Sequence, residues 1–147
     1  MGDGVIQYKN GTPVQSYNEK NAFKETAGGY GSGYCYIDGL AFDKNGNLWM
    51  TSSEVNHAVL VLDKAGAWHR LDIEQLRGVY TINDILITST NDKWIYVPRN
   101  TPKLVMIPNS ESLDEVSSYE FTTLIDTDGK ELTPSNYTCV AEDKDGY

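Results

Sequence analysis

The stretch LAFDKNGNLWM (residues 40–50) returns twice in this 147-residue chain. ILITSTNDKWI (85–95) matches it at a shift of 45 residues, which places Trp94 on Trp49. VAEDKDGY (140–147) matches it at a shift of 100 residues and stops two positions before the expected tryptophan. Self-similarity at a fixed period indicates a repeat architecture. We therefore expect three related units, the last cut off inside its repeat.

The turn at the centre of the stretch is DKNGN, and physical chemistry explains why an aspartate and a glycine occupy it. Asp43 can cap the backbone of a tight turn, and Gly46 can supply a left-handed backbone conformation. Asp143 and Gly146 occupy the same positions in the third copy. In the second copy the glycine is replaced by Asn91, a residue that tolerates the left-handed conformation. The sequence predicts the same hairpin turn in each copy.

Short segments rich in Val, Ile, Tyr and Trp follow each copy and read as further strands. After the first copy come AVLVLD (58–63) and AWHRLD (67–72), and after the second come KLVMIP (103–108) and YEFTTLI (119–125). The chain opens on a similar pair of segments, GVIQYKNGTPVQSY (4–17). Four short strands in a unit of about 45 residues are typical of a β-propeller blade.

The sequence thus predicts an all-β chain, a β-propeller fragment with two full four-stranded blades and a half-blade at each end. The expected limits are a half-blade at 4–17, blades at 36–72 and 80–125, and the start of the next blade at 136–147. Only DIEQLRG (72–78) predicts a helix, of at most two turns. Trp49 and Trp94 are expected to be structural and to pack between neighbouring blades.

Composition excludes some classes of function. The net charge of −9 argues against nucleic acid and against an anionic membrane surface. No run of 18 apolar residues occurs, so we expect no membrane insertion. The first residues, MGDGVIQYKN, lack the basic and apolar regions of a signal peptide, so export would need a signal elsewhere. Ten tyrosines and three tryptophans suit β-structure or a carbohydrate-binding surface.

Two segments, GLAFDKNGNLWMTS (39–52) and CVAEDKDGY (139–147), resemble the regulator-type β-propeller repeat of Bacteroidetes. Such repeats form the periplasmic sensor half of hybrid two-component systems. Related repeats occur in surface propeller proteins that accompany type IX secretion. The run GKELTPSNYTCVAEDKDGY (129–147) and the long divergent blade after AWHRLD favour the secretion-associated branch. TSTNDKW (88–94) departs from the pattern, because it lacks the acidic residue and the glycine of the turn.

This resemblance implies a non-enzymatic recognition or assembly domain of a cell-envelope protein, in the periplasm or at the surface of a Gram-negative bacterium. Its partners would be envelope proteins, or a glycan or lipopolysaccharide, and it would need no cofactor. The alternative is a glycan-sensing periplasmic domain of a hybrid two-component regulator. A lyase-like propeller enzyme is a more remote alternative. A sensor would carry a transmembrane helix and a kinase after its propellers. A secretion-associated protein would carry a C-terminal sorting domain instead.

The most unusual segment is ETAGGYGSGYCYIDG (25–39), with five glycines and three tyrosines. A phosphate-binding loop would need a preceding strand and a following helix, which the sequence does not predict. A connection between blades explains the segment without any ligand. The functional alternative is a ligand-facing loop in which Tyr30, Tyr34 and Tyr36 stack on sugars.

A calcium loop is the alternative interpretation of the first turn. Asp43, Asn45, Asn47 and Glu54 stand at loop positions 1, 3, 5 and 12 of an EF-hand pattern. Leu48, however, occupies the position that requires glycine. We therefore expect a capped hairpin and no metal site.

Two histidines and two cysteines complete the chemistry-bearing residues. His57 lies beside Glu54 in TSSEVNHAV and would be the candidate for a lyase-like site, whereas His69 is isolated in sequence. A polar loop pair of His57 and Glu54 explains the segment without catalysis and is the interpretation that we prefer, so we assign no catalytic residue. Cys35 and Cys139 are 104 residues apart, and the sequence leaves open a disulfide or two thiols.

The two half-blades have a consequence for association. Segment 4–17 supplies outer strands and segment 136–147 supplies inner ones, so they can combine into a composite blade within one chain or between two. Uncombined, they leave exposed strand edges and open blade faces. We therefore expect the chain to self-associate.

Overall fold

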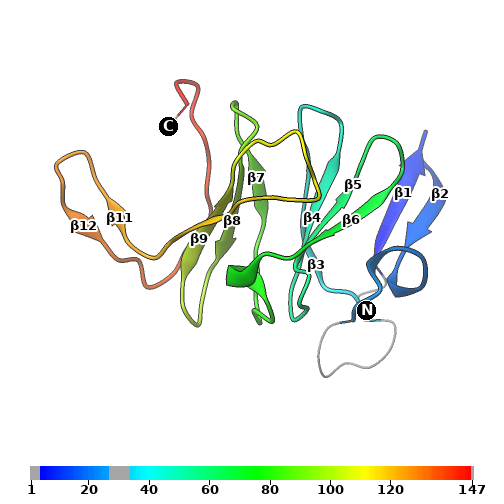
Figure 1. Ribbon diagram of the computed structural model, residues 1–147, viewed down its shortest axis with the longest axis horizontal. Coiled ribbons are helices and arrows are strands. Elements are labelled where there is room, and N and C mark those ends of the chain that lie inside the picture. The colour runs from blue at the N-terminus through cyan, green and yellow to red at the C-terminus, as the bar shows by residue number, and fades with distance from the viewer. Residues whose placement is uncertain (1–3, 27–33, 147) are drawn as a thin grey trace.

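The computed structural model describes residues 4–26 and 34–146. Within these ranges the chain forms four antiparallel sheets, two of four strands and two of two strands. The two larger sheets stand face to face in chain order, with a two-stranded hairpin on each side (Figure 1). This arrangement bears out the predicted all-β propeller architecture.

The first blade consists of β3 (Ile37–Phe42), β4 (Leu48–Ser52), β5 (Val59–Leu62) and β6 (Trp68–Leu71), paired in that order. Successive side chains of a strand point to opposite faces. Val59 and Val61 therefore point to the second blade, and Leu60 points to the β1–β2 side.

The second blade consists of β7 (Ile85–Ile87), β8 (Lys93–Val97), β9 (Lys103–Ile107) and β10 (Tyr119–Phe121), with β7 and β10 at its edges. The prediction of one strand over 119–125 is wrong. β10 ends at Phe121, and Leu124–Ile125 (β11) pairs instead with Glu131–Leu132 (β12).

Two segments flank the blades. Among the strands in the described part of the chain, β1 (Val5–Lys9) pairs only with β2 (Thr12–Tyr17). At the other end, residues 136–146 contain the predicted turn but no strand, which differs from the expected start of a blade. A strand requires backbone pairing with a neighbouring strand, and within the described ranges no strand pairs with this segment, which is held to the second blade by the Glu142 carboxylate accepting the N–H and hydroxyl of Ser89 at 2.6 and 2.7 Å.

The main core lies between the two blades. Val59, Val61 and Trp49 of the first blade pack with Ile95 and Val105 of the second, and each is at most 2% exposed. Burying a Val or Ile side chain stabilises the fold by about 1.5–3 kcal/mol. The seam between the blades is therefore the principal source of stability.

Smaller clusters cover the outer faces of the two blades. Met50 and Leu60 pack with the β1–β2 side of the molecule, where Phe23 and Trp68 lie edge to face at 5.5 Å. On the far face of the second blade, Tyr96 and Leu104 pack with Tyr137. Each blade thus buries apolar side chains on both faces, as a propeller blade must.

The positions of the two cysteines decide between a disulfide and two thiols. Cys35 is buried in the cluster beside β1–β2, whereas Cys139 is exposed near the chain's other end. Both residues lie in the described ranges and they form no disulfide.

Helical structure is limited to two short turns in the described ranges. η2 (Glu74–Leu76) lies within the predicted segment 72–78 but is shorter. η1 (Glu19–Phe23) was not expected from the sequence. It begins at Asn18, whose side chain accepts the N–H of Lys20 at 3.0 Å, and it buries Phe23. Neither helix has the length and hydropathy needed to cross a bilayer.

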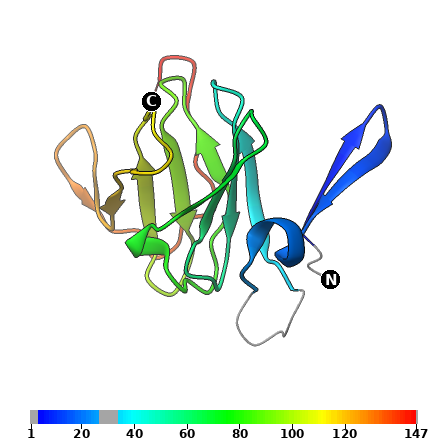
Figure 2. The same cartoon turned by 45° about the vertical axis from the view of Figure 1, so that its right-hand side comes forward.

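The connections divide the molecule into two ends. The turn end carries the hairpin turns 43–47, 63–67 and 88–92, and the loop end carries the connections 53–58, 72–84 and 98–102. In Figure 1 the turn end is at the top and the loop end at the bottom. Figure 2 shows the β1–β2 hairpin diverging from the first blade towards the turn end.

Candidate functional site

At the turn end, the Asp43 carboxylate organises the first hairpin. Its Oδ1 accepts the backbone N–H groups of Asn45 at 2.9 Å and Asn47 at 2.8 Å. Its Oδ2 accepts the side-chain amide of Asn47 and the indole N–H of Trp49, both at 2.9 Å. Burial alone would raise the pKa of Asp43, but the hydrogen bonds from Trp49 and Asn47 outweigh it and lower that pKa.

These contacts give the alternative interpretation of the turn, a calcium loop, no geometric basis. Asp43 uses its oxygens to accept N–H groups, and Asn45 contributes its backbone N–H. Glu54 lies in the connection 53–58 at the opposite end of the sheet. In the described ranges no group of three His, Cys, Asp or Glu side chains is placed to hold a metal ion.

The same turn recurs along the chain. Oδ1 of Asp63 and of Asp126 each accepts two backbone N–H groups, at 2.8 to 3.0 Å. Asp143 accepts the N–H of Asp145 at 2.9 Å. Positive φ angles occur at Gly46 (86°), Gly146 (89°) and, in the divergent copy, Asn91 (70°). Sequence inspection found the turns at Asp43 and Asp143 but did not assign the one at Asp63 to the pattern.

The two repeat tryptophans lie on equivalent faces of successive blades. Trp49 is 2% exposed between the blades, and the Lys93 ammonium lies 4.6 Å from its ring centroid. Burial lowers the pKa of Lys93, against the raising effect of Asp43. Trp94 is half-buried on the far face of the second blade, stacked on Phe121 at 5.5 Å.

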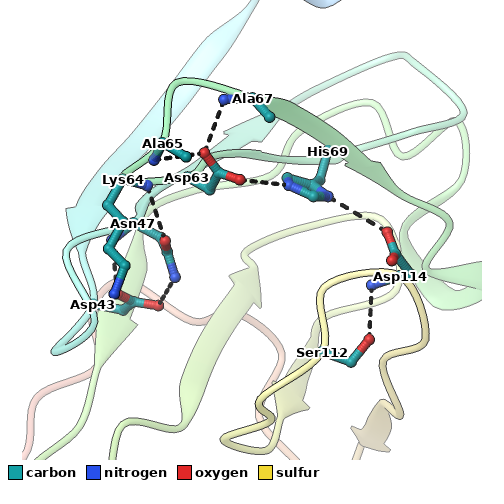
Figure 3. A network of polar contacts seen from close by, with 9 residues as sticks. All are labelled: Asp43, Asn47, Asp63, Lys64, Ala65, Ala67, His69, Ser112 and Asp114. Atoms are coloured by element: carbon teal, nitrogen blue, oxygen red, sulfur yellow. Dashed lines mark hydrogen bonds and ion pairs between the residues drawn. The ribbon is translucent and has the colours of Figure 1, made fainter.

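A chain of polar contacts links the first blade to residues 112–114 (Figure 3). Asp63 accepts a hydrogen bond from His69, whose other ring nitrogen lies 3.6 Å from Asp114. The His69 hydrogen bond is the main cause of the lowered pKa of Asp63. His69 therefore has two carboxylate neighbours in the structure, although the sequence analysis found it isolated.

At the loop end, the structure places two of the three candidate tyrosines together. The rings of Tyr34 and Tyr36 meet edge to face, with centroids 5.0 Å apart. Both side chains are half-buried. Tyr30 lies outside the described residues. The pair occupies the segment that leads into β3, at the loop end of the first blade.

The expected pairing of His57 with Glu54 is wrong, because His57 contacts Glu25. The Glu25 carboxylate pairs with His57 Nδ1 and accepts the backbone N–H groups of Asn56 at 2.9 Å and His57 at 3.2 Å. Burial would raise the pKa of Glu25, but the His57 and Asn56 hydrogen bonds outweigh it and lower that pKa. The contact ties the segment before the tyrosines to the β4–β5 connection.

Sequence reasoning missed a basic pocket of about 300 Å³ at the loop end. Arg77, Arg99 and Lys103 line it with Tyr80, whose side chain is 63% exposed, and no carboxylate is among its lining residues. Asp72 orients Arg77 through two hydrogen bonds of 2.6 Å that use Nε and Nη2. No sequence motif joins these residues, because the packing of the connection 72–84 against the β8–β9 connection brings them together.

Comparison with known proteins identifies the fold. No protein-family model matches the chain, and no curated protein sequence matches it significantly. Among solved structures it is similar to PorZ, an essential bacterial surface component of the type-IX secretion system of Porphyromonas gingivalis. The match has a TM-score of 0.82 and 19% sequence identity, and it covers 99% of this chain and 20% of the PorZ chain. This chain therefore has the fold of about a fifth of PorZ.

Proposed function

We propose that this chain belongs to a non-enzymatic recognition or assembly domain of a cell-envelope protein associated with type IX secretion. The observation that carries the proposal is the three-dimensional match to PorZ over 99% of the chain. The resemblance of residues 39–52 and 139–147 to envelope propeller repeats supports it independently. The domain would act in the periplasm or at the cell surface.

The loop end is the surface that we propose for recognition. Aromatic rings such as those of Tyr34 and Tyr36 can stack on the apolar faces of sugars. Arg99, in the pocket at the same end of the molecule, can pair with phosphate or carboxylate groups, whereas Lys103 already pairs with Glu120 at 2.9 Å. These residue types suit a glycan or lipopolysaccharide, or an envelope protein that carries an acidic segment.

A gene deletion in the source bacterium tests this function. The expected result is that proteins carrying type IX sorting domains accumulate in the periplasm instead of reaching the surface. Complementation with the wild-type gene should restore export. A gene carrying Arg99→Ala and Tyr36→Ala should restore it poorly, and the matched control Arg70→Ala, an exposed arginine on β6, should restore it fully.

The alternative sensor role gives a different outcome in the same strain. Export would be normal, and induction of glycan-utilisation genes by glycans would be lost. That result would contradict the secretion-associated proposal and favour the two-component regulator. Normal export together with normal induction would contradict both roles.

A further inference from the structure

The basic pocket at the loop end contrasts with the charge of the whole chain. The chain has a net charge of −9 and contains three arginines, Arg70, Arg77 and Arg99. Two of these arginines, Arg77 and Arg99, line this one pocket of about 300 Å³. The guanidinium group presents a planar fork of donors that matches a carboxylate or phosphate group. Two arginines at one concave place on an acidic molecule indicate a site for an anionic group.

Two of the three cations that line the pocket are already paired. Asp72 accepts two hydrogen bonds of 2.6 Å from Arg77, and Glu120 accepts one of 2.9 Å from Lys103. Neither carboxylate is among the residues that line the pocket. Within the described part of the chain, Arg99 has no ion pair and its side chain makes no hydrogen bond. The pocket therefore offers one uncompensated positive charge, which suits a ligand group with a single negative charge.

The backbone around Arg99 is constrained before any ligand binds. Arg99 lies in the β8–β9 connection between Pro98 and Pro102, and each proline fixes one φ angle. Asn100 and Thr101 follow it with positive φ angles of 56° and 99°. A positive φ is disfavoured for a β-branched residue such as Thr101, and backbone strain of this kind clusters at ligand sites. A connection that is already constrained loses little conformational freedom when a ligand binds.

The other residues that line the pocket suit a sugar ring. Tyr80 is 63% exposed there, and an aromatic ring can pack on the apolar face of a pyranose. The side chains of Thr81, Asn100 and Thr101 make no hydrogen bond within the described structure, so they can donate to and accept from sugar hydroxyls. Ligand pockets range from about 300 to 1,000 Å³, so this one suits a single sugar ring. A peptide would require a longer groove or a free strand edge.

We propose that this pocket binds one uronic acid residue of an acidic glycan, with the sugar carboxylate on Arg99 and the pyranose ring beside Tyr80. Asp72 uses Nε and Nη2 of Arg77, so Nη1 of Arg77 remains available as a further donor to the ligand. A phosphate monoester carries a charge of about −1.5 to −2 and matches one uncompensated cation less well. The inference rests on the proposed function for the choice of the loop end as the recognition surface, and it adds the class of ligand.

An NMR titration of the isotopically labelled chain with methyl β-glucuronide tests the site. Binding should saturate with a dissociation constant of about 1 mM, and the largest shifts should occur at the backbone amides of Asn100 and Thr101. Methyl β-glucoside, which lacks the carboxylate, should bind at least about tenfold more weakly.

Three variants assign the binding to Arg99. Arg99→Ala should weaken glucuronide binding at least about tenfold. Arg99→Lys keeps the charge without the planar fork, so its loss should be smaller. Arg70→Ala, the matched control on β6 outside the pocket, should bind like the wild type.

Two further probes separate the uronic acid from other anions. Glucose 6-phosphate and the acetylated amide of glutamate should each bind the wild type more weakly than the glucuronide does. Asp72→Asn leaves a second cation of the pocket, Arg77, uncompensated. This variant should therefore raise the affinity for glucose 6-phosphate relative to the glucuronide by at least about threefold.

Four results would overturn the proposal. They are the absence of saturable binding, equal binding of glucoside and glucuronide, tighter binding of either other anion to the wild type, and unchanged binding in Arg99→Ala. An unchanged ratio in Asp72→Asn would overturn the charge matching on which the choice of a carboxylate depends. Binding is measured on the purified chain, whereas the proposed function is tested by export in the deletion strain. Defective export without glucuronide binding would therefore reject the ligand class alone, and binding with normal export would reject the secretion role alone.

Discussion

The repeat turn between β3 and β4 and its copy between β7 and β8 follow the same backbone path with different side-chain chemistry. In each turn the N–H of the first residue, Asp43 or Thr88, donates to the carbonyl of the fifth residue at 2.9 Å. The fourth residue, Gly46 or Asn91, has a positive φ in both. The backbone geometry of the hairpin therefore does not depend on the carboxylate.

The carboxylate instead determines how the tryptophan is held. Asp43 accepts four hydrogen bonds, one of them from the Trp49 indole at 2.9 Å. The Thr88 hydroxyl accepts the N–H of Asp92 at 3.0 Å, and no contact joins it to Trp94. Trp49 is buried between two blades, whereas Trp94 is half-buried. The turn that contains the aspartate therefore holds the tryptophan buried between the blades. The turn that lacks it precedes the half-buried tryptophan on the far face of the second blade.

Truncating the two tryptophans should give the largest difference between the copies. Trp49→Ala removes a side chain packed between the blades and one of the four hydrogen bonds that Asp43 accepts, so it should lower the free energy of unfolding by about 3–5 kcal/mol. Trp94→Ala removes a half-buried ring and should cost roughly half as much, about 2 kcal/mol. Urea unfolding followed by circular dichroism measures both values. Equal costs would show that the two faces are equally packed.

Removing the carboxylate should have the next largest effect. Asp43→Ala leaves the buried Trp49 indole and the side-chain amide of Asn47 without an acceptor, so it should cost about 2–3 kcal/mol. The same unfolding experiment measures the loss. A loss of less than about 0.5 kcal/mol would mean that water replaces the carboxylate, and that the turn does not anchor the tryptophan.

The same aspartate predicts a pH dependence. Its pKa is lower in the folded chain than in the unfolded chain, where it is about 3.9. Its contribution to stability is therefore fully present above the unfolded pKa and is lost as the pH falls through the folded pKa. Stability measured from neutral pH into this acid range should fall less steeply in Asp43→Ala than in the wild type. Parallel curves would contradict this assignment.

The sequence predicted the features that depend on local chemistry. The period of 45 residues, the turns at Asp43 and Asp143 and the four-stranded units all follow from residue types at fixed spacing. The sequence did not predict helix η1, because the residues after its cap, Asn18, show no helical periodicity. The burial of Phe23 depends on tertiary packing, which a local pattern does not reveal. The end of β10 at Phe121 was missed because an apolar run does not specify its hydrogen-bond partner.

The loop end was much less predictable. Tyr34 and Tyr36 could be named because they are close in sequence, but the partner of His57 could not. Glu25 is 32 residues away, whereas Glu54 is a near neighbour in sequence. The pocket of Arg77 and Arg99 likewise forms from two connections that are separate in sequence, 72–84 and 98–102. Contacts that depend on the packing of separate units leave no local pattern to detect.

Adding a methyl group at Gly39, on the inner strand β3, tests how closely the two blades pack. A Cβ at Gly39 would lie 2.7 Å from the Ile85 nitrogen and 2.9 Å from the Asp84 Cα, which are backbone atoms of the second blade. Gly39→Ala should therefore force the blades apart and cost about 1–3 kcal/mol by overpacking. Thermal unfolding measures the cost. Adding Asp84→Ala should not restore stability, because the backbone clash remains, and a full rescue would contradict this explanation.

The smallest expected effect is at the divergent turn. Thr88→Ala removes the acceptor for the Asp92 N–H, but the backbone hydrogen bonds of the turn remain, so we expect a loss of about 0.5–1 kcal/mol. Because no contact joins Thr88 to Trp94, the double variant Thr88→Ala with Trp94→Ala should lose the sum of the two single costs. The corresponding cycle for Asp43 and Trp49 should depart from additivity, because those side chains share a hydrogen bond. Urea unfolding of the two cycles measures both couplings, and equal coupling energies would show that the carboxylate does not distinguish the blades.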